Sequence, residues 1–146
     1  MVTTPASDRP VVFLVALVAL LVAHQLGDHV LQTDRQAGDK AGRGAPAVRA
    51  MAGHLASYHA AAAAVLLGTF TVLDLPLTWL GVGAGLAFSA LTHGLLDRRW
   101  PVRALLVRTG SARFAESTAP VCGMYAADQA LHQAALLISA LLIALL

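Results

Sequence analysis

The sequence predicts an all-α integral membrane protein in which four helices cross the bilayer as one bundle. Apolar residues make up 58% of its 146 residues, and charged residues only 12%. The mean hydropathy is +0.69. Four apolar runs each exceed the roughly 18 to 20 residues that cross a bilayer core. These runs take up nearly the whole chain, so we expect a single membrane domain over residues 1–146 and no separate soluble domain.

The spans are expected at about 10–32, 47–73, 77–97 and 119–146. Pro10 suits the first turn of the first helix, because the N–H that proline lacks would be unpaired there anyway. Residues 33–47 contain several charges, glycines and Pro46, and this composition predicts a hydrophilic loop. The segment from Leu73 to Pro76 predicts a tight turn, which Trp79 follows at interfacial depth.

The first apolar run has one feature of a signal peptide, since Arg9 precedes its apolar core. No good small-x-small cleavage site closes the run, and its end carries polar side chains, so we expect a retained span. The single cysteine, Cys122, cannot form an internal disulfide. We expect it to be a small packing residue near the membrane edge.

Three glycines lie in the first half of the third span, at Gly81, Gly83 and Gly85. A nucleotide-binding loop would need a strand before it, and none is expected in these apolar surroundings. Gly81 and Gly85 instead predict a face of small residues on which a neighbouring helix packs closely.

A basic and aromatic belt, Arg98, Arg99 and Trp100, follows the third span. Residues 101–110 begin with proline and end with glycine, which predicts a short interfacial helix in the third loop, lying in the headgroup region. Arg98, Arg99 and Arg103 are candidates for holding anionic lipid headgroups.

Basic residues flank the first and third loops, whereas the second loop has none. The positive-inside rule therefore places both basic loops in the cytoplasm and both termini outside. The apolar runs make the lipid bilayer the expected partner. The net charge of +2 rests on few charged residues, so we expect no binding to nucleic acid. Nothing in the pattern decides between a monomer and an oligomer.

Seven polar residues of the four spans lie at one depth: His24, Asp28, His54, His93, Asp97, Asp128 and His132. Six of them form three pairs spaced four residues apart, so each pair shares one face of its helix. If the first helix is continuous, the same face extends to Gln32. At about 1.5 Å per residue, all seven fall within roughly the inner 15 Å of the bilayer. This agreement in depth indicates that the four helices build one site.

Aspartates within membrane spans cost about 2.5 to 3.5 kcal/mol near the centre and need compensation. Imidazole with carboxylate is the ligand set of Zn, Mn, Fe or Ni rather than of Mg or Ca. We expect one or two divalent transition-metal ions, with Zn preferred and Mn or Fe as alternatives. The expected metal ligands are His24, Asp28, His93, Asp97, Asp128 and His132.

Two further residues are expected to act in catalysis. His54 is the candidate for proton transfer if it is not itself a ligand, and Gln32 for donating a hydrogen bond to a substrate. Tyr58 shares the face of His54 and is expected to orient it. His29 and His59 point away from these faces, so we expect both to be peripheral.

The order of these motifs resembles a widespread family of small bacterial and phage inner-membrane proteins, catalogued as a domain of unknown function. The resemblance rests on Ala23-His24-x-x-x-Asp28-x-x-x-Gln32-Thr33, then His54, then His93-x-x-x-Asp97 with a basic residue after it, then Asp128-Gln129-x-x-His132. It implies a four-span fold in the bacterial inner membrane. More loosely, the His/Asp pairs are similar to those of membrane-bound metal-dependent hydrolases.

The function hypothesis is a membrane-embedded, metal-dependent hydrolase that acts on a lipid or another amphiphile from the cytoplasmic side. The same residues allow two alternatives. One is a non-enzymatic metal or proton conductor or sensor, and the other is a structural subunit whose polar cluster fixes helix packing. A conduction path would need polar residues as far as the outer face, and few are present there.

Overall fold

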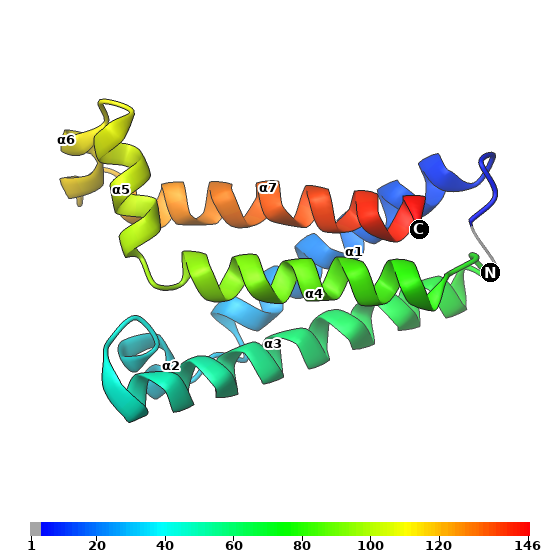
Figure 1. The fold of residues 1–146 in the computed structure, drawn as a ribbon, viewed down its shortest axis with the longest axis horizontal. Helices are drawn as coiled ribbons and strands as arrows, with labels where there is room; N and C mark the ends of the chain where they lie inside the picture. The colour runs from blue at the N-terminus through cyan, green and yellow to red at the C-terminus, as the bar shows by residue number, and fades with distance from the viewer. Residues whose placement is uncertain (1–3) are drawn as a thin grey trace.

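The computed structural model describes residues 4–146, and within them the chain is helical with no β-strand (Figure 1). Its helices are α1 (Arg9–His29), α2 (Asp34–Asp39), α3 (Gly44–Val72), α4 (Trp79–Leu96), α5 (Trp100–Arg108), α6 (Ala112–Glu116) and α7 (Gly123–Leu145). The predicted all-α fold class is confirmed.

Four of the helices in residues 4–146 are long and apolar enough to cross a membrane, namely α1, α3, α4 and α7. They run side by side as a bundle, with both termini at one end and α2, α5 and α6 at the other (Figure 1). The predicted four-span bundle is thus confirmed. Which end faces the cytoplasm stays a prediction.

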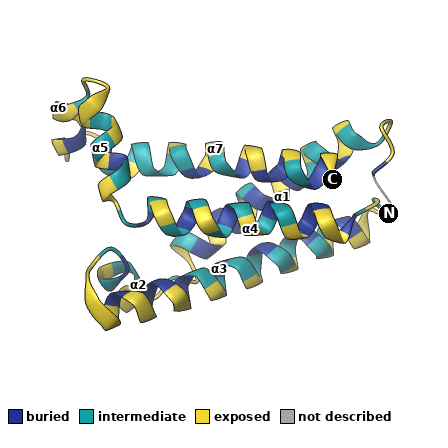
Figure 2. Ribbon diagram, viewed as in Figure 1, coloured by how far each residue is buried: buried dark blue, intermediate teal, exposed yellow. Residues whose placement is uncertain are grey.

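Exposed positions recur along each of the long helices (Figure 2). Many of them carry large apolar side chains, as expected for contact with lipid. On α1, for example, Leu14 and Val18 are exposed to 56% and 60%. The half of the bundle near the termini is also apolar inside, where Val12 and Ala16 of α1 pack with Leu66 and Phe70 of α3 and with Ile143 of α7. The buried histidines and the buried charged residues lie in the other half.

Two glycines allow the close approach of α4 and α7. A Cβ atom on Gly81 would lie 2.7 Å from the carbonyl oxygen of Ile143, and one on Gly85 would lie 2.8 Å from that of Ser139. Both separations are too short for real atoms, so only glycine fits. The predicted small-residue face is confirmed, whereas Gly83 lies on open space.

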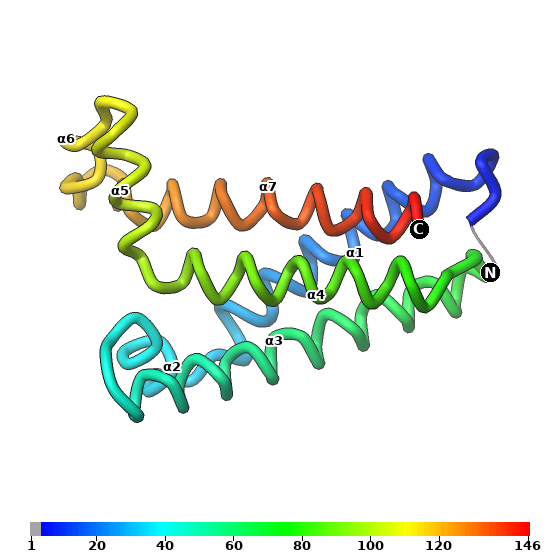
Figure 3. Tube along the Cα trace, viewed as in Figure 1, coloured from blue at the N-terminus to red at the C-terminus, as the bar shows by residue number. Residues whose placement is uncertain are grey.

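The composition of residues 33–47 predicted a hydrophilic loop, but part of this segment forms the short helix α2. Thr33 accepts a hydrogen bond from the backbone N–H of Gln36, and the Gln36 side chain accepts one from the backbone N–H of Thr33. Such a capping box stabilises the start of a helix. The trace in Figure 3 shows α2 folding back beside the first turns of α3, against which it packs.

The structure also shifts several predicted boundaries. α1 ends at His29, so Gln32 does not lie on its helical face. The interfacial helix predicted at 101–110 is present as α5, and α6 follows it without having been foreseen. α7 begins at Gly123 instead of at 119, because its N-cap Cys122 has an extended backbone conformation.

Candidate metal centre

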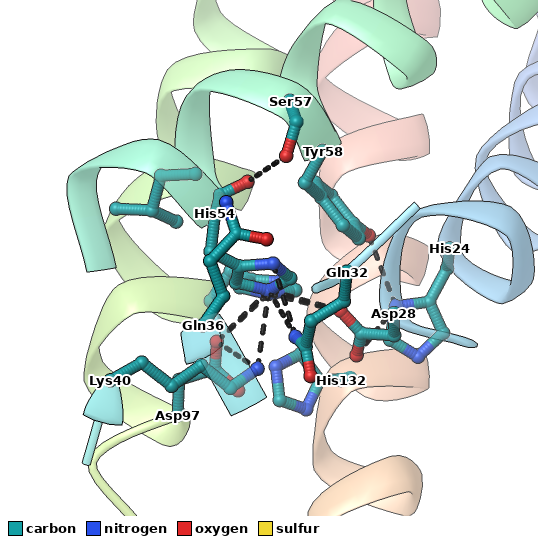
Figure 4. Close-up of polar contacts among 12 residues, drawn as sticks. His24, Asp28, Gln32, Gln36, Lys40, His54, Ser57, Tyr58, Asp97 and His132 are labelled. Carbon is teal, nitrogen blue, oxygen red and sulfur yellow. Dashed lines mark hydrogen bonds and ion pairs between the residues drawn. The ribbon is translucent and has the colours of Figure 1, made fainter. Parts of the chain in front are cut away.

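The four long helices bring all seven predicted residues into one largely buried group, here called the His/Asp cluster. Figure 4 labels His24, Asp28, His54, Asp97 and His132 of this group. Its members are His24 and Asp28 of α1, His54 of α3, His93 of α4 with its C-cap Asp97, and Asp128 and His132 of α7. Each i,i+4 pair projects from one helical face, as the spacing predicted.

His54 and His93 form the buried centre of this cluster, with their Nε2 atoms 2.9 Å apart. The Oδ1 atom of Asp28 lies 3.2 Å from Nε2 of His54 and 3.4 Å from Nε2 of His93. The Oδ2 atom of Asp97 lies 3.2 and 3.1 Å from the same two nitrogens. Neighbouring ligands of a tetrahedral ion bound at about 2.0 to 2.1 Å are about 3.3 Å apart. The two nitrogens and either oxygen are therefore spaced as three ligands of one ion.

His132 contributes a buried nitrogen that has no hydrogen-bond partner in the described part of the chain. Its Nδ1–H donates to the backbone carbonyl of Asp128 at 2.9 Å, which leaves a lone pair on Nε2. Nε2 has no hydrogen-bond partner among residues 4–146. An unpaired buried polar atom costs about 1 to 3 kcal/mol, and metal-ligating histidines commonly donate from the other ring nitrogen in this way. The lone pair of His132 thus fits a metal ion.

A second ligand group shares Asp97 with the first. Ligand atoms of Asp97, Asp128 and His132 all lie within 4.8 Å of one another, as do those of His54, His93 and Asp97. A carboxylate common to two such groups can bridge two ions. Two histidines with one carboxylate, or one histidine with two, leave coordination positions open for water or a substrate.

His24 is held differently, because both of its ring nitrogens have protein partners. Nδ1 lies 3.1 Å from the hydroxyl of Tyr58, and Nε2 lies 3.1 Å from Oε1 of Gln129. Tyr58 therefore contacts His24 by hydrogen bond, where the sequence predicted that it would orient His54. Gly27 makes this possible, since a Cβ there would lie 2.5 Å from the Tyr58 ring. His24 also forms a possible ligand group with Asp28 and His93.

Gln32 reaches the cluster although α1 ends before it. Its side-chain amide nitrogen, Nε2, lies 3.1 Å from Nδ1 and 3.3 Å from Nε2 of His54. An amide can present either its nitrogen or its oxygen. With the amide turned so that its oxygen accepts from Nδ1–H, Gln32 would leave Nε2 of His54 with a lone pair for a metal ion. Gln32 is thus placed to orient His54, and it also lines the pocket described below.

Lys40 is a member of the site that the sequence analysis missed. It is the C-cap of α2, and its Nζ lies 2.8 Å from Oδ2 of Asp97 and 3.2 Å from Nε2 of His54. Its side chain is only 8% exposed. In the sequence it is one of the basic residues of the first loop, which indicate topology. The Thr33–Gln36 capping box was the available signal that the loop folds, although nothing in the sequence pairs Lys40 with Asp97.

His29 and His59 lie outside the candidate ligand groups, in agreement with the peripheral positions expected for them. His29 is exposed, and its Nε2 lies 2.7 Å from the hydroxyl of Tyr125. His59 contacts the backbone carbonyl of Leu55 and the hydroxyl of Ser89. Cys122 was expected to be packed, but it is exposed at the start of α7.

A pocket of about 400 Å³ opens onto the cluster at the end of the bundle that carries α2 and α5. The three aspartates of the cluster line it, whereas the four histidines lie behind them. Its lining residues are Asp28, His29, Gln32, Lys40, Asp97, Arg99, Cys122, Met124, Tyr125, Asp128 and Gln129. A metal ion held by the carboxylates would therefore be within reach of a molecule in the pocket.

Comparison with known proteins identifies a family but no activity. Residues 16–146, most of the chain, match the family described as "Protein of unknown function (DUF3307)". No curated protein and no solved structure matches the chain.

Proposed function

The chain belongs to the DUF3307 family, and we propose that it is a membrane-embedded, metal-dependent hydrolase that acts on an ester-bearing amphiphile. The proposal rests on the buried Nε2 of His132, which has no hydrogen-bond partner among residues 4–146 and lies beside Asp97 and Asp128, two carboxylates that line a pocket. Zinc is the preferred ion, and manganese or iron would suit the same ligands.

The distances favour a division of roles within the His/Asp cluster. We assign one ion to His54, His93 and Asp97, and a second to Asp97, Asp128 and His132. This moves His54 from proton transfer, its expected role, to ligation, because its Nε2 lies among the other ligand atoms. Ions held in this way would supply Lewis acidity, which polarises an ester and makes a nearby water acidic enough to attack at neutral pH.

We assign Asp28 to proton transfer, although the sequence predicted it, like His24, as a metal ligand. It lines the pocket, and its Oδ2 lies 3.7 Å from Nδ1 of His24. In the reaction, the water oxygen bonds to the carbonyl carbon of a carboxylic ester, or to the phosphorus of a phosphoric ester. The bond from that atom to the leaving oxygen then breaks. Asp28 takes the proton from the water and returns it to the leaving group. Tyr58 and Gln129 hold His24 in place beside Asp28.

The apolar half of the bundle supports a hydrolase over a conductor. A path for ions or protons would need polar groups along its whole length. Among the described residues, the buried side chains near the termini include the hydroxyls of Thr78 and Ser139 but no charged group. The polar pocket lies at the other end of the bundle, as expected for a one-sided catalytic site.

The proposal further places the chain in a bacterial inner membrane with the pocket on the cytoplasmic side. The motif resemblance and the basic loops support this placement. Arg98, Arg99 and Arg103 follow α4 at the pocket end, where they would meet anionic headgroups.

The first test is the metal content of protein purified in detergent without chelator. We expect about two equivalents of zinc in the native protein, and about one in His132→Gln. His59→Gln is the matched control, because it removes a half-buried histidine outside the ligand groups, and it should keep both ions. A native protein that takes up no zinc, manganese or iron would refute the metal centre and the hydrolase together.

The second test separates catalysis from metal binding. The zinc-loaded protein should release product from ester-bearing amphiphiles, and a chelator should stop it. Asp28→Asn should keep its zinc and lose turnover. If the zinc-loaded protein hydrolyses none of a panel of carboxylic and phosphoric esters in a chelator-sensitive way, the proposed hydrolysis is wrong. The metal centre would still stand.

A further inference from the structure

Two cationic side chains share the pocket with the three carboxylates. Lys40 is paired with Asp97, as described above. Arg99 lines the pocket too, and it has no ion-pair partner among residues 4–146. A pocket that needed only to hold metal ions would gain nothing from two fixed positive charges, since they repel a cation.

Arg99 has a backbone conformation that its side chain disfavours. Its φ is 62°, in the left-handed region, where glycine is the residue that fits without strain. A strained residue at a site suggests that the side chain is needed there. The side chain of Arg99 is exposed to the pocket at the junction of α4 and α5, where a planar guanidinium can bind two oxygens of an anion.

Metal binding would reverse the charge of this pocket. With neutral histidines, three aspartates and two cations leave one net negative charge on its lining. One divalent ion makes the lining positive, and a second makes it more so. An ion ligated by Asp97 would also take this carboxylate from Lys40, whose ammonium would then be free to contact a ligand.

The surroundings of the pocket are those of an amphiphile site. Val30 and Leu31 flank the pocket residues His29 and Gln32, and Val121 precedes Cys122. These three apolar side chains are exposed to between 47% and 68%. Polar groups inside and apolar groups at the margin match a molecule with an anionic head and hydrocarbon chains.

We propose that the pocket binds an amphiphile carrying a phosphate group, that Lys40 and Arg99 hold this phosphate, and that metal binding creates the subsite by taking Asp97 from Lys40. Phosphate suits the site because its several oxygens can contact a lysine, an arginine and an ion at once. The inference rests on the metal centre proposed above and names the substrate class of that hydrolase.

Calorimetry on detergent-purified protein tests the proposal, with dihexanoyl phosphatidic acid, inorganic phosphate and dihexanoylglycerol as separate probes. We expect the zinc-loaded protein to bind the phosphatidic acid and the zinc-free protein to bind none of the three. Free phosphate should bind more weakly, and dihexanoylglycerol not at all. Inorganic phosphate binding as tightly as the lipid would overturn the assignment to an amphiphile.

Arg99→Gly is the decisive variant, because it relieves backbone strain while it removes the proposed contact. Its melting temperature should be unchanged or higher, and its affinity for phosphatidic acid should fall at least about tenfold, as for the loss of a hydrogen bond to a charged group. Asp74→Gly is the matched control, since Asp74 also has a positive φ, of 50°, in the loop between α3 and α4. It should bind the lipid as the native protein does.

The outcomes separate this inference from the proposed function. Protein that takes up no metal refutes both. Protein that takes up zinc but binds phosphatidic acid equally in the native, Arg99→Gly and Lys40→Met forms overturns the phosphate subsite and leaves the metal centre standing.

Discussion

Replacing Lys40 by methionine should make the protein bind zinc more tightly while making the zinc-free protein less stable. The Lys40 ammonium lies where a metal ion would compete with it, 2.8 Å from Asp97 and 3.2 Å from the ring nitrogen of His54. Methionine keeps most of the length of the unbranched side chain and removes the charge. Asp97 is then left without its cation until a metal ion arrives.

The size of the effect follows from the geometry. At 2.8 Å and an effective dielectric constant of about 20, the attraction of Lys40 and Asp97 is about 6 kcal/mol before desolvation. Removing one partner of a buried pair costs about 3 to 5 kcal/mol. We expect the zinc-free variant to lose about 3 kcal/mol, and the zinc-loaded variant to lose about 1 kcal/mol or less. The difference of about 2 kcal/mol corresponds to roughly 30-fold tighter zinc binding.

Competition with a chelating dye measures the zinc affinity, and circular dichroism measures the melting temperature with and without zinc. Arg35→Met is the control, because Arg35 forms an ion pair on the same helix at 3.9 Å but is 74% exposed. It should change stability by less than about 0.5 kcal/mol and zinc affinity not at all. If Lys40→Met binds zinc no better than the native protein, Lys40 does not compete with the ion, and its role is to position Asp97.

Three further predictions concern packing, orientation of a ligand and topology. Gly85→Ala should lower the melting temperature in detergent, because overpacking against α7 costs about 1 to 3 kcal/mol. Gly83→Ala is the control, since a Cβ there meets open space, and it should be neutral or slightly stabilising. Equal melting temperatures of the two variants would contradict the close contact of Gly85 with α7. Gln32→Leu should weaken zinc binding by about tenfold or more through loss of its contact with His54, whereas an unchanged affinity would remove its orienting role. The single exposed Cys122 should react with an impermeant maleimide in inside-out vesicles but not in spheroplasts, and the reverse result would invert the predicted topology.

Helical periodicity explains why much of the site could be predicted. The pairs His24/Asp28 and Asp128/His132 share helical faces wherever their helices form, and apolar composition alone indicates those helices. The prediction failed where it extended a helix too far. Gln32 continues the spacing of four, but α1 ends at His29, and the residue reaches His54 from a loop.

Contacts between helices carry no such periodicity. Tyr58 lies four residues after His54, yet its hydroxyl contacts His24, because Gly27 lets the ring approach α1. Gln129 follows Asp128 and contacts the same histidine. Which partner a polar side chain finds depends on how the helices rotate and tilt against each other, and small packing residues decide that.

The sequence by itself determined the all-helical class, the four spans and the shared depth of seven polar residues, because hydropathy and a period of 3.6 residues are local properties. Only the tertiary structure decided that α2 folds back to place Lys40 between Asp97 and His54, and that Arg99 shares their pocket. These contacts join residues far apart in the chain, and their geometry follows from the packing of α2 on α3 and of α4 on α7.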